Sequence, residues 1–315
     1  MKKIVILGGG TGQSTLLRGL KQFPVDISAV VSVCDDGRST GRLREEFNIF
    51  AVGDLRKVIV SLSETEPLFE ELLNYRFETT SDLNGHTVGN LLLTALSNIT
   101  GNMQEGIETF GKVLKLKGKV LPFTLDSPTL IGQMEDGSII KGEHYITESP
   151  LQIKKVYYEK DVVVNPNVLQ AIQESDLIIL SMGSLYTSII PDLLNQELVT
   201  SLDKSKAKIM YVCNMMTQPG ETDSFRVSDH IKVLDSYLGK KKISVVIANN
   251  GEIPSDILKK YETEEQKDQV IFDQENLKNV RVITRNYVTI ENHTIRHNVN
   301  KLSVDIYDYL IEEGE

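Results

Sequence analysis

Four glycines fall within the five-residue segment Gly8–Gly12, between a short apolar run and a stretch of helical length. Glycine lets the backbone turn sharply and approach a ligand, and the start of a helix offers free N–H groups and the positive end of its dipole. The segment is neither a dinucleotide fingerprint nor a P-loop, because Gln13 and Thr15 stand where glycine is needed and no lysine follows. A tight turn without a ligand is the alternative, although so many glycines cost conformational entropy that a plain turn would not require. The residues predicted to bind a phosphate group are Gly9, Gly10, Thr11 and Gly12.

A second polar segment, Cys34–Arg44, follows the next apolar run and combines two aspartates with three arginines. Asp35 and Asp36 are candidate partners for a ribose hydroxyl, candidate catalytic groups and candidate ligands for Mg²⁺. Proteins hold Mg²⁺ through one or two carboxylates while the bound phosphates supply further oxygens. Arg42 is a candidate cation for the ligand. A solvated charged loop is the alternative interpretation.

Two further segments, Gly53–Lys57 and Asn84–Asn90, bring additional polar side chains. Asp54 and Asn90 are candidates for helix capping and for ligand binding, because their side chains accept hydrogen bonds from exposed N–H groups. His86 is a candidate phosphate donor or general base, and a purely structural histidine is equally compatible with the sequence.

Polar segments also follow two later apolar runs. Gly183 and Ser184 predict a second anion-binding turn, since small hydroxyl residues and glycine leave backbone N–H groups accessible. The surrounding sequence lacks the Gly-x-Ser-x-Gly pattern of a nucleophile elbow. Asn214 and Thr217 offer the donors and acceptors that read a base or a sugar edge. Cys213 fits a small buried hydrophobe better than a nucleophile, because no base is adjacent in the sequence.

The elements that would position these residues are short runs rich in Val and Ile, which predict buried parallel strands. Amphipathic stretches of helical length separate most of them, which favours one α/β domain over residues 1–315, a Rossmann-like, doubly wound and mostly parallel sheet. Four of the polar segments follow such runs, so we expect them to meet at one edge of the sheet. The predicted strands are Ile4–Leu7, Ile27–Val33, Leu177–Leu180, Ile209–Cys213, Ile243–Ala248 and Val280–Ile283, and the predicted helices include Thr15–Gln22, Asn90–Ile99, Val168–Glu174 and Asp229–Leu238.

The region from about 118 to 158 differs, because short apolar runs are divided by turn residues. It predicts a small antiparallel β insertion with a hairpin tip at Asp136 and Gly137. Its expected strands are Val120–Leu125, Thr129–Met134, Ile139–Ile146 and Ile153–Tyr158. The polar stretch Tyr261–Gln274 is expected to be a loop or a solvated helix.

The composition of the chain argues against several classes of function. The 315 residues carry a formal charge of −10, which argues against binding to nucleic acid or to an anionic membrane surface. Two cysteines without CxxC spacing indicate neither a disulfide framework nor a zinc knuckle. No apolar run reaches the length of a membrane span or a signal sequence, and we expect a cytoplasmic protein.

The chain resembles the gluconeogenesis-factor (YvcK-like) family, which is related to the CofD 2-phospho-L-lactate transferases. The segments that carry the resemblance are Gly8–Gly12, Gly183–Ser188, Thr217–Thr222 and Ser228–His230. One departure is Arg38, where the family usually has glycine. The resemblance implies a homodimer with a Rossmann-like core and a pocket to which Tyr186 also contributes, and in which Arg296 meets a diphosphate.

What the resemblance implies for function is binding of a nucleotide-sugar of the UDP-N-acetylglucosamine type. It further implies a role in cell shape and cell-wall synthesis on gluconeogenic carbon sources. The alternative is a Mg²⁺-dependent transferase of the 2-phospho-L-lactate transferase type, acting on a nucleotide-linked phosphate donor. A nicotinamide-dependent oxidoreductase is less compatible with the broken glycine fingerprint. Mg²⁺ is the one cofactor that these residues indicate.

Overall fold

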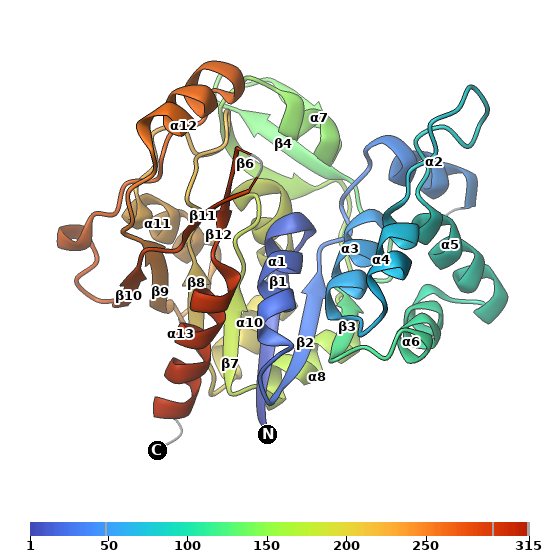
Figure 1. Ribbon diagram of the computed structural model, residues 1–315, viewed down its shortest axis with the longest axis horizontal. Coiled ribbons are helices and arrows are strands. Elements are labelled where there is room, and N and C mark those ends of the chain that lie inside the picture. Colours follow the sequence, from blue (N-terminus) through green and yellow to red (C-terminus); the bar gives the residue numbers. More distant parts are fainter. Residues whose placement is uncertain (48, 292, 314–315) are drawn as a thin grey trace.

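A seven-stranded sheet forms the centre of the molecule, with the order β10-β9-β8-β7-β1-β2-β3 (Figure 1). The structure is a computed structural model that describes residues 1–47, 49–291 and 293–313, with the side chain of Arg38 outside the description. Neighbouring strands of the sheet all run parallel, and each of the six predicted strands lies in it. The strands are β1 (Lys2–Gly8), β2 (Val25–Val31), β3 (Lys119–Pro122), β7 (Leu177–Leu180), β8 (Lys208–Val212), β9 (Ile243–Asn249) and β10 (Arg281–Arg285).

The strand order reverses direction between β1 and β7. The chain proceeds from β1 outward through β2 to β3, returns to β7 beside β1, and proceeds outward on the other side to β10. In such sheets the loops at the two carboxyl ends diverge and leave a crevice. The predicted α/β, Rossmann-like doubly wound fold is confirmed.

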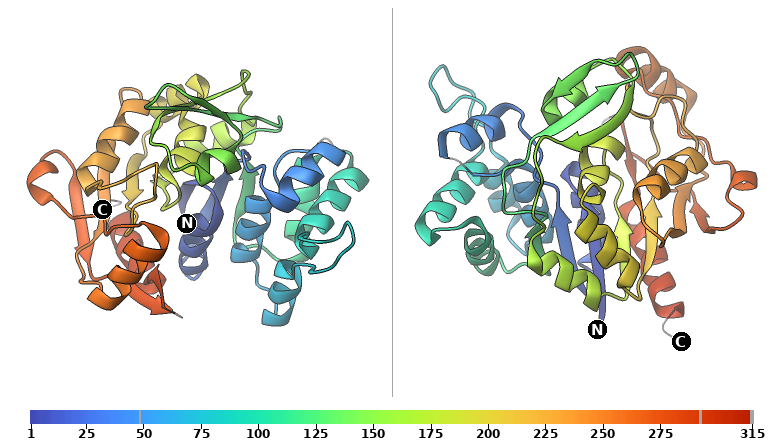
Figure 2. Two further views of the ribbon diagram at one scale, coloured as in Figure 1. Left: turned by 90° about the horizontal axis from the view of Figure 1, so that it is seen from above. Right: turned by 180° about the vertical axis from the view of Figure 1, so that it is seen from behind.

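Helices cover both faces of the sheet because its strands are apolar on both sides. Successive residues of β1 alternate between the faces: Ile4 and Ile6 join one core cluster, and Val5 and Leu7 join the other. The first face is covered by α1 (Gly10–Leu20), α3 (Gly53–Leu62) and α13 (Val299–Glu312) (Figure 1). The second is covered by α8 (Pro166–Glu174), α10 (Gln196–Lys204) and α11 (Val227–Tyr237), seen from behind in Figure 2.

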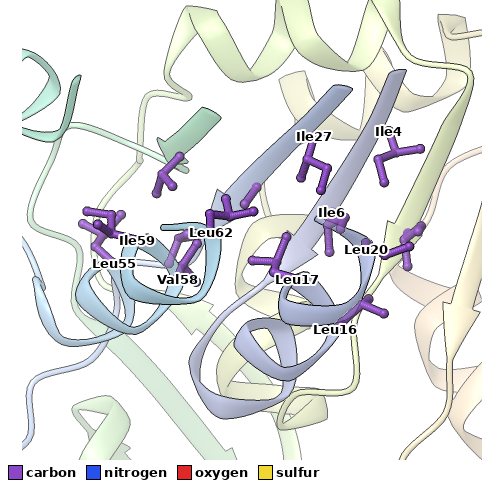
Figure 3. Close-up of a cluster of buried hydrophobic side chains, with 14 of the residues drawn as sticks. Ile4, Ile6, Leu16, Leu17, Leu20, Ile27, Leu55, Val58, Ile59 and Leu62 are labelled. Atoms are coloured by element: carbon purple, nitrogen blue, oxygen red, sulfur yellow. The ribbon is translucent and has the colours of Figure 1, made fainter. Parts of the chain in front are cut away.

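The packing of α1 on the sheet fixes the glycine-rich segment in place. Leu16, Leu17 and Leu20 of α1 are fully buried beside Ile6 of β1 (Figure 3). Each such side chain contributes about 1.5–3 kcal/mol of burial free energy. The helix begins at Gly10 rather than at the predicted Thr15, so Gly10 and Gly12 lie in its first turn.

Helices follow β2 in a group at one side of the sheet (Figure 1). The sequence pattern predicted only one of these helices, Asn90–Ile99, which lies within the longer α5. Besides α3, they are α2 (Arg38–Phe47), α4 (Pro67–Asn74), α5 (Val88–Thr100) and α6 (Met103–Val113).

The predicted β insertion is smaller than expected. A three-stranded antiparallel sheet forms from β4 (Leu130–Met134), β5 (Ile139–Lys141) and β6 (Ile153–Tyr158), with the predicted hairpin between β4 and β5. The expectation for Val120–Leu125 is wrong, because β3 pairs in parallel with β2 at the edge of the main sheet. The expected strand Ile139–Ile146 ends at Lys141, and α7 (Glu143–Glu148) follows it.

The remaining elements lie in the second half of the chain, between β7 and the C-terminal helix α13. A hairpin of β11 (Val288–Glu291) and β12 (Thr294–His297) precedes α13 and was not predicted. The polar stretch after residue 260 begins with a π-helix, Tyr261–Glu265, at the end of α12 (Ser255–Lys260). The others are a π-helix at Leu185–Ile189, a 3₁₀ turn at Gln274–Asn276 and α9 (Ile190–Leu193). Within the described ranges, none of the helices combines the length and the apolar character needed to cross a bilayer.

Candidate functional site

Five segments far apart in the sequence meet at the carboxyl edge of the sheet and enclose a cleft of about 590 Å³, here called the strand-end cleft. In Figure 1 this edge lies at the top, below the β4–α7 insertion and α12. Three of the segments follow β1, β7 and β8, the fourth is the stretch 261–267, and the fifth is the β11–β12 hairpin. The residues used below that line it are Gly9–Gly12, Gly183, Ser184, Asn214, Thr217, Tyr261, Glu265, Lys267, Arg296 and His297.

The amino end of α1 forms the floor of the cleft. Its first turn contains no acidic residue, and the N-cap Gly9 offers no side chain to cap the free N–H groups. Glycine is required here by close contacts: a Cβ on Gly12 would lie 1.7 Å from the carbonyl oxygen of Met182. A Cβ on Gly9 would lie 2.8 Å from the Asp54 carboxylate. The helix N-terminus therefore lines the cleft without a side-chain cap, with the Asp54 carboxylate beside Gly9 and Gly10. Uncapped N–H groups at a helix start favour an anion.

The segment after β7 is held by a buried carboxylate. Ser184 donates its hydroxyl hydrogen to Glu221, with Oγ 2.6 Å from Oε2, and the Tyr186 N–H donates to the same oxygen. Thr187 in turn donates to the Ser184 hydroxyl at 2.7 Å. Burial raises the pKa of Glu221. Ser184 therefore both lines the cleft and ties it to the loop after β8.

Asn214, the second residue after β8, lines the cleft and has one side-chain atom without a partner. Its Nδ2 donates to the carbonyl oxygen of Gly183 at 2.9 Å. Its Oδ1 is buried and has no hydrogen-bond partner among the described residues. An orphaned buried acceptor of this kind indicates a missing donor.

The β11–β12 hairpin forms another wall of the cleft and contributes Arg296 and His297 to it. Arg296 is exposed on β12 and makes no ion pair within the described part of the chain. His297 Nε2 lies 3.2 Å from the carbonyl oxygen of Cys213. Burial lowers the pKa of His297 to about 4, so the ring is neutral at physiological pH. Lys267 pairs with Glu265 at 2.7 Å, so Arg296 is the cation on this wall that a ligand would meet without displacing a carboxylate.

An acidic cluster lies behind the glycine turn, away from the lining of the strand-end cleft. Asp54 approaches Gly9 and pairs with Lys57 at 2.9 Å. Burial and the charge of Asp54 raise the pKa of Asp35, and burial together with both aspartates raises the pKa of Glu143 to about 8. Asp54 is thus close enough to affect the protonation of both Asp35 and Glu143. Among the residues that the structure describes, no three His, Cys, Asp or Glu side chains are grouped as a metal site.

Asp36 does not face this cluster. Its Oδ1 accepts a hydrogen bond from the His144 N–H at 2.9 Å, in the first turn of α7. Gly142 approaches so closely that a Cβ would lie 2.6 Å from the other carboxylate oxygen. Asp36 therefore joins the loop after β2 to the β insertion.

His86 and Asn90 belong to a separate buried network below α2 and α5. His86 Nδ1 lies 2.8 Å from the Ser39 hydroxyl, to which Asn90 also donates. Arg56 donates to the Asn90 side chain at 3.1 Å. Burial lowers the pKa of His86, which keeps it neutral at pH 7. These contacts are those of an interior network that orders the helices around the site.

The structure thus divides the predicted site residues into two groups. The first lines one cleft: Gly9, Gly10, Thr11, Gly12, Gly183, Ser184, Asn214, Thr217 and Arg296. The second does not line it: Asp35, Asp36, Arg42, Asp54, His86, Asn90 and Tyr186. In the second group, Tyr186 is buried in the core and Arg42 donates to the Asn84 carbonyl oxygen. The cysteines are buried, and burial raises the pKa of both thiols to about 12, as expected of small hydrophobes.

Sequence reasoning missed several residues of the site. Glu221 lies in the polar segment after β8, but nothing in its spacing indicates that it contacts Ser184. Lys267 and Tyr261 come from the stretch that was expected to be a loop, and both line the cleft. His297 was visible only as the neighbour of Arg296. The alternation of Val288–Glu291 and Thr294–His297 around a short turn was the available signal for this hairpin.

Comparison with known proteins gives consistent results. A sequence model of the family described as 2-phospho-L-lactate transferase CofD matches residues 4–288. The gluconeogenesis factor of Bacillus subtilis is 45% identical over 313 residues, covering 98% of each chain. That of Halalkalibacterium halodurans is 43% identical over 310 residues, covering 98% of this chain and 96% of the relative. A crystal structure of a Bacillus halodurans protein matches with a TM-score of 0.93 and 43% identity, covering 97% of this chain and 99% of that one.

Identity of this extent, over nearly the whole length and on one fold, establishes the relationship. The chain belongs to the gluconeogenesis factor family and contains a domain of the CofD type.

Proposed function

We propose that this protein binds a nucleotide-sugar of the UDP-N-acetylglucosamine type in the strand-end cleft. The observation that carries the proposal is that the uncapped amino end of α1 and Arg296 line the same cleft of about 590 Å³. Helix N–H groups and a guanidinium are the usual donors for a diphosphate. Asn214 and Thr217 add groups that can contact a sugar or a base.

Local charge decides whether an anion can bind to a chain of formal charge −10. The carboxylates of the acidic cluster do not line the cleft, and the one that approaches the glycine turn, Asp54, is paired with Lys57. The carboxylate of Glu265 is paired with Lys267. A charge-assisted hydrogen bond contributes about 1.5–3 kcal/mol, so Arg296 is a large part of the expected affinity.

For the cell, we propose the role that the resemblance implies: a factor in cell shape and cell-wall synthesis during growth on gluconeogenic carbon sources. Its relatives named gluconeogenesis factor support this assignment. We further propose that the protein acts in the cytoplasm as a homodimer, binding a small molecule rather than nucleic acid.

Titration calorimetry with UDP-N-acetylglucosamine tests the proposal. The wild-type protein should bind, and Arg296→Ala should weaken binding by roughly tenfold or more. Arg18→Ala is the matched control, because Arg18 is an exposed arginine that pairs with Glu70 outside the cleft. Absence of heat at millimolar ligand, or equal losses in the two variants, would contradict the proposal.

A second candidate function is a Mg²⁺-dependent transferase acting on a nucleotide-linked phosphate donor. The acidic cluster favours it: Asp35 and Asp54 would hold Mg²⁺, and the bound ion would neutralise charge on the transferred group. Asp36 is a weaker candidate ligand than Asp54, because its Oδ1 accepts from the start of α7 and its Oδ2 lies close to Gly142. Lys57 binds only Oδ1 of Asp54. Turnover of a nucleotide-linked donor that is lost with EDTA and with Asp54→Asn would support this function. Turnover that is insensitive to both would exclude the metal role.

A further inference from the structure

Two side chains of the strand-end cleft offer hydrogen-bond acceptors that the chain itself does not use. They are Asn214 Oδ1 and His297 Nδ1, and both residues line the cleft. A third acidic acceptor, Glu265, is already paired with Lys267. Among the other groups described around the cleft, the helix N–H groups and Arg296 are donors, and the hydroxyl oxygens of Ser184 and Thr217 already accept hydrogen bonds within the chain.

The orientation of the Asn214 amide is fixed by its partner. The Gly183 carbonyl oxygen can only accept, so the group facing it at 2.9 Å must be the NH₂. The oxygen is therefore the atom left without a partner in a buried position. Leaving a buried acceptor unpaired costs about 1–3 kcal/mol, which a ligand donor would recover.

The same reasoning fixes the tautomer of His297. Its Nε2 faces the Cys213 carbonyl oxygen, which can only accept, so Nε2 carries the hydrogen. The ring is neutral, and Nδ1 is then an acceptor with no donor among the described residues. The side chain of His297 is held by the carbonyl oxygen of Cys213, and Asn214 is the next residue in the chain. The two acceptors are therefore positioned by adjacent residues of the loop after β8.

Both acceptors are adjacent to the phosphate-binding groups. His297 follows Arg296 directly on β12. Asn214 donates to the carbonyl oxygen of Gly183. Gly183 in turn packs against the first turn of α1, because its nitrogen would lie 3.2 Å from a Cβ placed on Gly12. In a nucleotide-sugar the diphosphate is bonded to the ribose on one side and to the hexose on the other. The base is attached to the ribose and so lies further from the phosphates than either sugar. Sugar hydroxyls are donors, and a neighbouring pair of them matches a neighbouring pair of acceptors.

We propose that Asn214 Oδ1 and His297 Nδ1 accept hydrogen bonds from hydroxyls of the sugar that carries the phosphate, and so select hydroxylated over deoxy ligands. The inference rests on the proposed function and adds a specificity determinant to it. The hydroxyls belong either to the ribose or to the hexose of a nucleotide-sugar, and the same experiment distinguishes these sources.

The test is titration calorimetry of the wild type, His297→Phe, His297→Gln and Asn214→Leu with four ligands: UDP, 2′-deoxy-UDP, 3′-deoxy-UDP and UDP-N-acetylglucosamine. Each lost hydrogen bond should weaken wild-type binding by roughly three- to tenfold. The measured quantity is the ratio of affinities for two ligands in the same variant. A substitution that merely disturbs the cleft weakens all ligands together and leaves the ratios unchanged.

If the hydroxyls belong to the ribose, the ratio of UDP to deoxy-UDP should fall toward one in His297→Phe and Asn214→Leu. If they belong to the hexose, the ratio of UDP-N-acetylglucosamine to UDP should fall instead. His297→Gln retains a donor and an acceptor and should keep more of the ratio than His297→Phe. Ratios that are the same in every variant would overturn the inference while leaving the proposed function intact, and failure of all four ligands to bind the wild type would overturn both.

Discussion

The Ser184 hydroxyl donates to the Glu221 carboxylate, with Oγ 2.6 Å from Oε2, although the residues are 37 positions apart. This hydrogen bond joins the loop after β7 to the loop after β8, and both loops form walls of the strand-end cleft. Glu221 is only 3% exposed, so its carboxylate depends on Ser184 and on the Tyr186 N–H for its hydrogen bonds. The geometry of the cleft therefore depends on a contact that lies beneath its surface.

Removing this contact should destabilise the fold. We expect Glu221→Ala to lower the free energy of unfolding by about 1–3 kcal/mol, because the donors at Ser184 and Tyr186 lose their buried partner. Urea unfolding of Glu221→Ala, Ser184→Ala and the double variant measures the coupling. The double variant should be less destabilised than the sum of the singles, by at least about 0.5 kcal/mol. Strict additivity would show that the two residues do not act as a pair.

The contact between Gly12 and Met182 predicts a steric effect. Gly12→Ala would place a Cβ 1.7 Å from a backbone oxygen, which cannot move aside as a flexible side chain can. The expected loss of stability is at least about 1–3 kcal/mol, measured by thermal or urea unfolding.

Gly111→Ala is the matched control, since Gly111 also lies within a helix and its Cβ would meet only the end of the Leu116 side chain, at 3.0 Å. That variant should be unchanged or more stable by up to about 1 kcal/mol, because alanine favours helix. Equal effects of the two substitutions would contradict the structural account of the glycine turn.

Glu143 predicts a dependence of stability on pH. Its pKa is raised from 4.5 to about 8, so between these values the folded state retains a proton that the unfolded state has lost. Stability should therefore fall as the pH rises from about 5 toward 8, by an amount governed by about 1.4 kcal/mol for each unit of pKa difference.

Glu143→Gln cannot ionise and should show a shallower decline over the same range. Urea unfolding at several pH values compares the two proteins, so that titration of all other groups is common to both. Parallel curves would show that Glu143 does not have a raised pKa in the folded state.

Asp36 should act as a structural link rather than only as a ligand-binding group. Its carboxylate accepts from the His144 N–H at the start of α7, and loss of such a bond costs about 1 kcal/mol. Asp36→Ala is expected to lower the free energy of unfolding by this amount. Asp256→Ala, at an exposed aspartate in the first turn of α12, should change it by less than about 0.5 kcal/mol. A larger loss of stability in Asp256→Ala than in Asp36→Ala would contradict the structural role of Asp36.

Sequence pattern was sufficient for the central sheet but not for its edge. Strands that are buried on both faces are continuous apolar runs, and Ile4–Leu7 and Leu177–Leu180 have this pattern. The short edge strand β3 has no such signature, because the brief apolar run that follows Lys119 fits an antiparallel strand equally well. Its pairing with β2 is fixed by the helices α2 to α6 that separate the two strands in sequence, most of which the apolar pattern did not reveal.

The candidate site was predictable to the level of loops. Parallel strands place their carboxyl ends together, so the meeting of Thr11, Ser184 and Asn214 followed from topology. The direction of a side chain within a loop depends on its tertiary partners. Asp36 turns to α7 and Tyr186 packs into the core, and neither choice is encoded in the spacing of the polar residues.

The most direct test of ligand binding in the strand-end cleft is a crystal structure of the complex with UDP-N-acetylglucosamine. We predict a diphosphate against the first turn of α1, within hydrogen-bond distance of the Arg296 guanidinium. The contrary result would be ligand elsewhere, for example in the cavity lined by Lys3, Lys112 and Lys119, with none in the strand-end cleft.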